Sequence, residues 1–273
     1  MNTATPVVSA TQLRKFYPTR GRQNSGVLAV ESIDFELRQG NCLGIVGESG
    51  SGKTTIAKML LGIEIPTAGT ITVAGRDRSI PARGSSERRK RGRELQMVFQ
   101  DPYTSLDPRQ TGWSCLREVI QLHFPDQTRS QVESRILELG SQVGLSAEQL
   151  LVRPNSLSGG QRQRVAIARA LASEPQAIIL DEAVSGLDVS IQAQILNLLM
   201  DIKRETGVAY LFISHDLAVI RQMAGYVIVM ESGRVVEEGE TARVLDNPKE
   251  NYTRMLRESV PGPGWSPKRR NLV

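Results

Sequence analysis

A glycine-rich segment with one lysine is the strongest chemical signal in the sequence. Residues 47–54 read GESGSGKT and fit the pattern G-x-x-x-x-G-K-[ST] at every fixed position. The glycines allow a tight backbone curl in which successive N–H groups point inward, toward phosphate oxygens. Lys53 would bring a positive charge to the β- and γ-phosphates of a nucleoside triphosphate, and the Thr54 hydroxyl is suited to bind Mg²⁺. The residues predicted to contact the nucleotide in and after this phosphate loop are Gly47, Glu48, Ser49, Gly50, Ser51, Gly52, Lys53, Thr54 and Thr55.

Two carboxylates follow an apolar run further along the chain. Residues 177–182 read AIILDE, which predicts a buried strand with Asp181 and Glu182 at its carboxyl end, the edge where open α/β sheets bind ligands. Asp181 would reach the metal shell, directly or through water. Because successive strand side chains point to opposite faces, Glu182 can take a different task and address a water behind the γ-phosphate. An isolated Asp-Glu pair is more often a helix cap, but a phosphate loop in the same chain favours the catalytic interpretation.

The elements that must position these residues alternate along the chain. Amphipathic periodicity over 131–143 and 189–205 predicts helices between short apolar strands. This alternation indicates a mainly parallel sheet covered on both faces, whereas the start of the chain and Thr70–Val73 favour antiparallel strands. The segment from about 101 to 165 shows no convincing strand and predicts a helical insertion. The predicted strands are Val7–Leu13, Ala29–Leu37, Cys42–Val46, Thr70–Val73, Leu95–Phe99, Ala177–Leu180, Val208–Ile213 and Tyr226–Met230.

Composition narrows the class of protein. Apolar residues make up 40% and charged residues 23%, which excludes intrinsic disorder and collagen-like fibres, and no apolar stretch approaches the roughly 18 residues of a membrane span. The two cysteines, Cys42 and Cys115, have no zinc-site or disulfide pattern.

The chain has a net charge of +5, and many of its basic residues fall in 76–93. We interpret that run as a solvated loop leading into a charged helix, with a lipid-headgroup or nucleic-acid patch as the alternative.

The segment 157–161 reads LSGGQ and opens a second amphipathic helix, RQRVAIARAL. Serine and glycine at a helix start make a second site that can bind an anion, in addition to the phosphate loop. One nucleotide does not need both sites from the same molecule. LSGGQ is the signature of ATP-binding cassette (ABC) ATPases, which this sequence resembles. The resemblance implies a P-loop NTPase core with an antiparallel β subdomain and a helical insertion. It also implies that Leu157, Ser158, Gly159, Gly160 and Gln161 cover the γ-phosphate held by a partner subunit in a head-to-tail dimer.

The other motifs of the family occur in the same order, over residues 7–250. Tyr17 resembles the aromatic residue that stacks on adenine, with Phe16 as a rival. Gln100 resembles the Q-loop glutamine that contacts metal and water.

Ser185 to Asp188 resemble the D-loop between the two sites, with Gly186 in place of the usual alanine, a difference that we expect to matter little. His215 resembles the switch histidine that steadies the γ-phosphate and Glu182, whereas His123 has no such context and is expected at the surface. The implied catalytic residues are Glu182, His215, Gln100 and Lys53, and the implied metal ligands are Thr54, Gln100 and Asp181.

Finer resemblance favours the oligopeptide, dipeptide and nickel importer branch. It rests on QDPYTSLDPR, LDVSIQAQILNLL and NPKENYTRML. Ala183 departs from the proline that usually follows the Asp-Glu pair, and this leaves the substrate class open. We expect one ABC ATPase domain over 1–250 and a short extension over 251–273 that is disordered from 261.

The resemblance implies an ATPase subunit that powers import, with ATP and Mg²⁺ as cofactors. Its implied partners are a second ABC ATPase, identical or homologous, two transmembrane permeases and, indirectly, an extracellular solute-binding protein. No nucleic acid is expected, and the chain would lie peripherally on the cytoplasmic face of the membrane. The alternatives are a soluble ABC ATPase that acts with nucleic acid or ribosomes, and a cassette recruited to a cytosolic enzyme complex.

Overall fold

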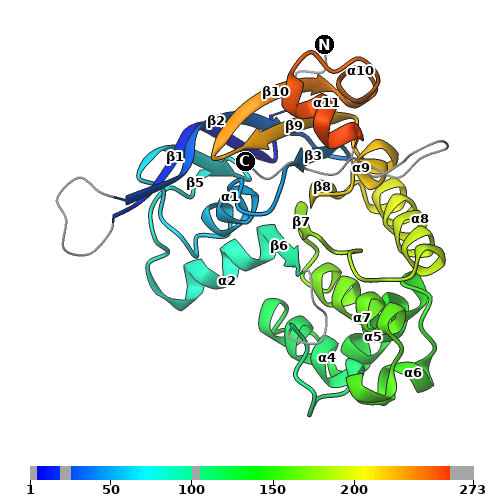
Figure 1. The fold of residues 1–273 in the computed structure, drawn as a ribbon. Helices are drawn as coiled ribbons and strands as arrows, with labels where there is room; N and C mark the ends of the chain where they lie inside the picture. Colours follow the sequence, from blue (N-terminus) through cyan, green and yellow to red (C-terminus); the bar gives the residue numbers. More distant parts are fainter. Residues whose placement is uncertain (1–4, 19–25, 100–104, 259–273) are drawn as a thin grey trace.

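The computed structural model describes residues 5–18, 26–99 and 105–258. In this part of the chain, ten strands form one sheet in the order β5-β4-β1-β2-β10-β9-β3-β8-β7-β6 (Figure 1). The strands are β1 (Val8–Pro18), β2 (Gly26–Leu37), β3 (Cys42–Val46), β4 (Ala68–Val73), β5 (Arg76–Asp77), β6 (Leu95–Val98), β7 (Ala177–Asp181), β8 (Ala209–Ser214), β9 (Tyr226–Glu231) and β10 (Arg234–Glu240). The helices are α1 (Lys53–Leu60), α2 (Gly84–Glu94), α4 (Gly112–His123), α5 (Arg129–Gln142), α6 (Ala147–Leu151), η1 (Pro154–Ser156), α7 (Gly159–Leu171), α8 (Val189–Thr206), α9 (Leu217–Met223), α10 (Thr241–Asp246) and α11 (Asn251–Glu258).

Five adjacent strands, β9, β3, β8, β7 and β6, form the predicted parallel core. Every residue of β3, β7 and β8 is buried, as expected for parallel strands covered on both faces. The ladder aligns Val46 with Ser214, and Asp181 with Ile213. The carboxyl ends of β3, β8 and β7 therefore meet at one edge, where the phosphate loop, His215 and Glu182 follow.

The two faces of this core contact different helices. Along β8, Tyr210 and Phe212 join an apolar cluster that includes Ile195 of α8. The alternate residue Leu211 joins a second cluster, which includes Ile56 of α1. The period of two along the strand thus determines which helix each side chain meets.

The predicted antiparallel strands at the start of the chain are confirmed. β1 pairs with β2 and with β4 in antiparallel registers. β10 joins this part to the core through one parallel pair, Arg234 with Ser32. Figure 1 shows the β1–β2 ribbon extending to one side of α1.

The region between β6 and β7 is helical, as predicted. Described residues 105–158 contain no strand, and α4 to α7 gather on one side of the sheet (Figure 1). Capping boxes begin α5, where Thr128 pairs with Gln131, and α6, where Ser146 pairs with Gln149. No helix in the described ranges is both long enough and apolar enough to cross a membrane.

The arginine-rich run leads into a helix, as interpreted from the sequence, and most of its basic side chains are exposed, but it is not solvated throughout. It forms β5 and α2, and two of its arginines are buried rather than solvated. Arg78 is 3% exposed and pairs with Glu94, the last residue of α2. Arg91 donates to the Ile80 carbonyl and pairs with Glu87. Buried guanidinium groups need partners, so these contacts hold α2 against the residues that precede it. Composition alone does not reveal this structural role.

His123 is not the simple surface residue that was expected. Its Nδ1 atom is buried and has no hydrogen-bond partner among the described residues. Burial lowers the pKa of His123, and the nearby Arg93 and Arg89 lower it further. Of the predicted C-terminal extension, residues 251–258 form α11, and the segment from 261 lies outside the described residues.

Candidate nucleotide-binding site

The phosphate loop joins β3 to α1 and is enclosed by backbone on two sides. A Cβ atom on Gly47 would lie 2.1 Å from the Met230 carbonyl oxygen, and one on Gly52 would lie 2.3 Å from the Ala29 carbonyl oxygen. Gly52 also has a φ of 103° at the start of α1. Only glycine fits both positions, which explains the fixed glycines of the motif.

Lys53 folds back into this loop. Its Nζ atom donates to the carbonyl oxygens of Gly47 and Glu48, each at 2.8 Å, and lies 3.3 Å from the Ser51 hydroxyl. Burial lowers the pKa of Lys53, and the carboxylates of Glu182, Asp181 and Glu48 oppose that shift. The ammonium group therefore lies at the base of the loop, where it can meet a phosphate oxygen.

The end of β7 presents the two predicted carboxylates in different surroundings. Asp181 is 7% exposed, and burial raises its pKa, while a hydrogen bond from the Thr54 side chain opposes the shift. Glu182 leaves the strand conformation with a φ of 49°, and its N–H donates to the Ile213 carbonyl at 2.9 Å. The left-handed turn ends β7 and leaves the Glu182 carboxylate partly exposed, so the two acids can have separate tasks.

His215 follows β8 and faces Glu182. Its Nδ1 atom lies 3.1 Å from Glu182 Oε1, and the imidazole side chain is 59% exposed. The neighbouring strands β7 and β8 thus bring together two residues that are 33 positions apart.

These residues share one open cleft of about 1000 Å³. The cleft brings together the phosphate loop, Glu182 and His215. Asp181 does not line it but is close enough for its charge to act on Lys53. Its lining residues are Val27, Leu28, Ala29, Glu48, Ser49, Gly50, Gly52, Lys53, Thr54, Thr55, Glu182, His215 and Ser232.

The adenine-stacking residue is not settled by this arrangement. Neither Tyr17 nor Phe16 is among the residues that line the cleft. Tyr17 pairs across the β1–β2 ladder with Val27, which does line it, and Phe16 pairs with Leu28. The Lys15 ammonium lies 4.7 Å from the centre of the Tyr17 ring. Stacking by Tyr17 therefore stays a prediction, and the predicted Gln100 lies outside the described residues.

The signature residues lie apart from this cleft. Ser158 caps α7 in a capping box: its hydroxyl accepts from the Gln161 N–H, and its own N–H donates to Gln161 Oε1. A Cβ atom on Gly160 would lie 2.7 Å from the Ile191 side chain, so α7 and α8 approach closely there. None of Leu157 to Gln161 lines the cleft, and Ser158 is exposed.

The predicted D-loop connects Glu182 to α8. The Ser185 N–H and hydroxyl both donate to the Glu182 carbonyl, at 2.9 and 2.8 Å. Asp188 precedes the first turn of α8 without a side-chain capping bond. Gly186 has a φ of 76°, so its identity matters more than we expected, because alanine would be strained there.

Two further contacts to the phosphate loop were not predicted. The Gly233 N–H donates to the Ser51 carbonyl at 3.1 Å, from a turn in which Ser232 and Gly233 both have positive φ. The Glu48 N–H donates to the Tyr252 hydroxyl at 3.0 Å. A Ser-Gly pair between two strand patterns is a signal for such a turn, but no sequence signal links Tyr252 to the loop.

Comparison with known proteins places this geometry in a family. The family model described as ABC transporter matches residues 30–185. The oligopeptide transport ATP-binding protein OppD of Mycobacterium tuberculosis is 47% identical over 87% of this chain and 38% of its own length. OppF of Lactococcus lactis is 40% identical over 93% of this chain and 80% of its own length. The chain therefore spans less than half of the first of these relatives and most of the second.

Solved structures have the same fold. The dimeric post-hydrolysis structure of the ATP-binding cassette MJ0796, bound to ADP and Pi, superposes with a TM-score of 0.75 at 27% identity, covering 86% of this chain and 98% of that one. The cbiO1 structure from Clostridium perfringens gives a TM-score of 0.76 at 24% identity, over 89% and 91% of the two chains. With its phosphate loop, acidic strand end and signature helix, the chain belongs to the ABC transporter family and has the fold of its ATP-binding cassettes.

Proposed function

We propose that this chain is the ATP-binding and hydrolysing subunit of an ABC importer for peptides or related small solutes. The observation that carries the proposal is the convergence of Lys53, Asp181, Glu182 and His215 at one sheet edge beside the phosphate loop. The relatives support the direction and class of transport, since their names specify oligopeptide transport and, for GsiA of Pectobacterium atrosepticum at 43% identity, glutathione import. None of these three names mentions nickel, so nickel transport stays a prediction from the sequence.

The phosphate loop would hold the triphosphate through backbone amides and one cation. The N-terminus of α1 begins at Lys53, so its unpaired N–H groups and positive helix end point at the same anion. The Lys53 ammonium, now bonded to carbonyl oxygens of its own loop, would move or share its hydrogens with the β- and γ-phosphates. The loop carbonyls are neutral acceptors, whereas phosphate oxygens carry negative charge, so attraction between opposite charges favours the phosphate.

The donors beside the loop fit Mg²⁺. Thr54 supplies a hydroxyl oxygen and Asp181 a carboxylate oxygen, and the two side chains are hydrogen-bonded to each other. Oxygen ligands of this type, completed by phosphate and water, suit a small hard cation. When bound, Mg²⁺ would neutralise charge on the phosphates. Gln100 is a further predicted ligand outside the described residues.

Glu182 would orient or deprotonate the attacking water. It lines the cleft, it is partly exposed, and His215 Nδ1 lies 3.1 Å from its carboxylate. His215 can hold this carboxylate in place and present its other ring nitrogen to the γ-phosphate. Lys53 would stabilise charge on the transferred phosphoryl group from the side of the phosphate loop.

The second half of each site would come from another subunit. The helix start at Ser158 is exposed and does not line its own cleft. A second copy or a homologous subunit, arranged head to tail, would place Leu157–Gln161 over the γ-phosphate. The MJ0796 cassette with ADP and Pi is described as dimeric, which supports this arrangement.

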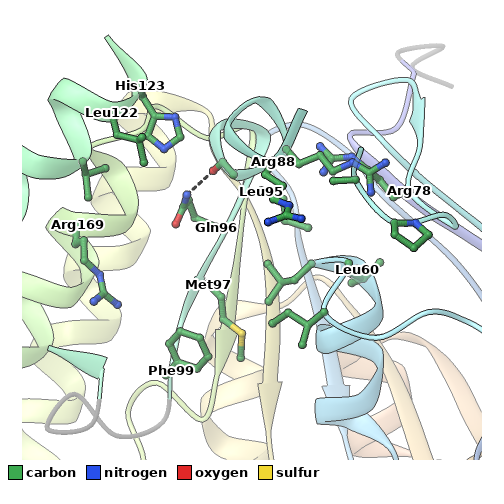
Figure 2. Close-up of a pocket in the computed structure, with 18 residues that line it drawn as sticks. Leu60, Arg78, Arg88, Leu95, Gln96, Met97, Phe99, Leu122, His123 and Arg169 are labelled. Atoms are coloured by element: carbon green, nitrogen blue, oxygen red, sulfur yellow. Dashed lines mark hydrogen bonds between the residues drawn. The ribbon is translucent and has the colours of Figure 1, made fainter. Parts of the chain in front are cut away.

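A groove beside the site fits a segment of a transmembrane permease. It has a volume of about 680 Å³ and lies between α1, α2, β6 and α4 (Figure 2). Phe99 and Leu122, which line it, are 43% and 49% exposed. Exposed apolar side chains in a concave surface mark a partner site. Phe99 directly precedes Gln100, so a permease segment in the groove would adjoin the predicted Q-loop. Two such permeases, fed by an external binding protein, would keep this chain at the cytoplasmic face of the membrane.

Co-purification with hydrolysis tests the proposal. The full chain is expressed with its candidate permeases, solubilised and assayed for ATP hydrolysis with Mg²⁺. We expect hydrolysis in the membrane complex and its loss in Glu182→Gln. A chain that binds ATP but purifies only with ribosomes, nucleic acid or a soluble enzyme would overturn the importer assignment.

A further inference from the structure

The C-terminal helix α11 contacts the phosphate loop through one tyrosine. Tyr252 is 9% exposed, and its hydroxyl accepts a hydrogen bond from the Glu48 backbone N–H at 3.0 Å, across 204 residues of sequence. Burial raises the pKa of Tyr252, and the hydrogen bond from Glu48 opposes that shift. The hydroxyl is therefore neutral at physiological pH and available to the loop.

This hydrogen bond acts on the same peptide unit that holds Lys53. The Glu48 N–H and the Gly47 carbonyl belong to one planar peptide group. On one side of this group the N–H donates to Tyr252, and on the other the carbonyl accepts from Lys53 Nζ at 2.8 Å. The rotation of one peptide plane is thus fixed between α11 and the lysine.

Helix α11 is itself anchored. The Glu237 carboxylate on β10 accepts from the N–H groups of Lys249 and Glu250, at 2.9 and 3.2 Å, just before the helix begins. Arg254 donates to the Lys249 carbonyl at 2.8 Å, and Arg257 to the Asp246 carbonyl at 2.8 Å. These bonds stabilise the helix start and keep Tyr252 in place.

We infer that Tyr252 is a positioning residue for nucleotide binding, because it fixes the Gly47–Glu48 peptide group and, through it, Lys53. Without the hydroxyl, the peptide group can rotate and the Lys53 ammonium loses its fixed acceptor. The loop then spends less time in the conformation that receives phosphate. The apparent affinity for ATP falls in proportion to the population of that conformation. The inference rests on the proposed phosphate-binding role of the loop and adds α11 to it.

The test compares Tyr252→Phe with Tyr226→Phe in the full chain. Both variants remove one phenolic hydroxyl, but Tyr226 is 45% exposed at the start of β9, four residues before Met230, whose carbonyl oxygen a Cβ atom on Gly47 would meet. We expect Tyr252→Phe to raise the Kd for Mg-ATP about two- to tenfold, the range for one net hydrogen bond. Tyr226→Phe should bind like the wild type. Equal Kd values in the two variants would overturn the inference.

A second readout separates positioning from general stability. Exchange of the Glu48 amide, followed by NMR on nucleotide-free protein, should accelerate in Tyr252→Phe while amides of β7 and β8 keep their wild-type rates. Uniform acceleration across the sheet, with an unchanged Kd, would mean a structural role only and would also overturn the inference.

A third variant approaches the same contact from the other end of α11. Glu237→Gln leaves Tyr252 intact but removes a charged acceptor from the helix start. It should weaken Mg-ATP binding in the same direction and by a smaller factor than Tyr252→Phe. If the wild type fails to bind ATP, the proposed site itself is wrong. If the wild type binds and both variants match it, only the role of Tyr252 fails.

Discussion

Replacing Glu182 by glutamine tests the chemical step with little change to the fold. The two side chains have nearly the same size, and the left-handed backbone at Glu182, with a φ of 49°, is no more strained for glutamine than for glutamate. The substitution removes a negative charge that raises the pKa of Asp181, so it should not weaken the binding of Mg-ATP.

The magnitude follows from the role of the carboxylate. Glutamine cannot accept a proton from water, and general-base catalysis contributes about 10²–10⁴-fold to the rate. At about 1.36 kcal/mol for each factor of ten, the barrier should rise by roughly 2.7–5.4 kcal/mol. His215 remains beside the side chain, 3.1 Å from Oε1 in the wild type, so the geometry of the cleft should be kept.

The assay is phosphate release by the membrane complex at saturating Mg-ATP, together with a Kd for ATP on the isolated chain. Glu205→Gln is the matched control, because it removes an exposed carboxylate near the end of α8. We expect wild-type turnover in the control and a loss of at least about a hundredfold in Glu182→Gln, with similar affinity. Turnover within a few-fold of wild type would refute the role of Glu182 as the base.

Three other experiments have distinct expected outcomes. Burial raises the pKa of Asp181, so its negative charge destabilises the fold at neutral pH, and this destabilisation disappears as the pH falls below the ordinary pKa of 3.8. Asp181→Asn should therefore raise the thermal midpoint of the nucleotide-free chain at pH 7, and raise it by less at lower pH. A lower midpoint at pH 7 would contradict this. Gly52→Ala places a Cβ atom 2.3 Å from the Ala29 carbonyl oxygen at a φ of 103°, so it should abolish ATP binding in a titration, whereas tight binding would mean that the loop is open there. Ser158→Ala and Lys53→Ala subunits, each inactive alone, should regain hydrolysis when mixed if one composite site suffices, and a mixture without any activity would count against sites shared between subunits.

The local chemistry of the site could be read from the sequence because it lies in short segments. The phosphate loop needs glycines where backbone carbonyls approach, and β3 and β7 are short buried strands that lead directly to the predicted site residues. The helix faces predicted for α5 and α8 are buried or packed against the core. Periodicity and turn chemistry act within a few residues, so one sequence is enough to show them.

Contacts between distant segments could not be read in this way. Tyr252 meets Glu48 across 204 residues, and no local pattern distinguishes it from an ordinary core aromatic residue. Arg78 is buried against Glu94, although Arg78 lies in a segment whose composition indicates a solvated surface. The positive φ of Glu182 occurs where its N–H bonds to the Ile213 carbonyl of the distant strand β8, a contact that no local pattern shows.

The most direct test of the account is an ATP titration with Mg²⁺ on the purified full chain, compared with Lys53→Ala and Lys58→Ala. Both lysines belong to α1, but Lys53 lies inside the phosphate loop and Lys58 is exposed in the last turn. Loss of a charge-assisted contact worth about 1.5–3 kcal/mol should weaken binding roughly 10- to 150-fold in Lys53→Ala, while Lys58→Ala should bind like the wild type. A wild-type chain without saturable ATP binding, or an unchanged Kd in Lys53→Ala, would contradict the claim that this loop holds the nucleotide.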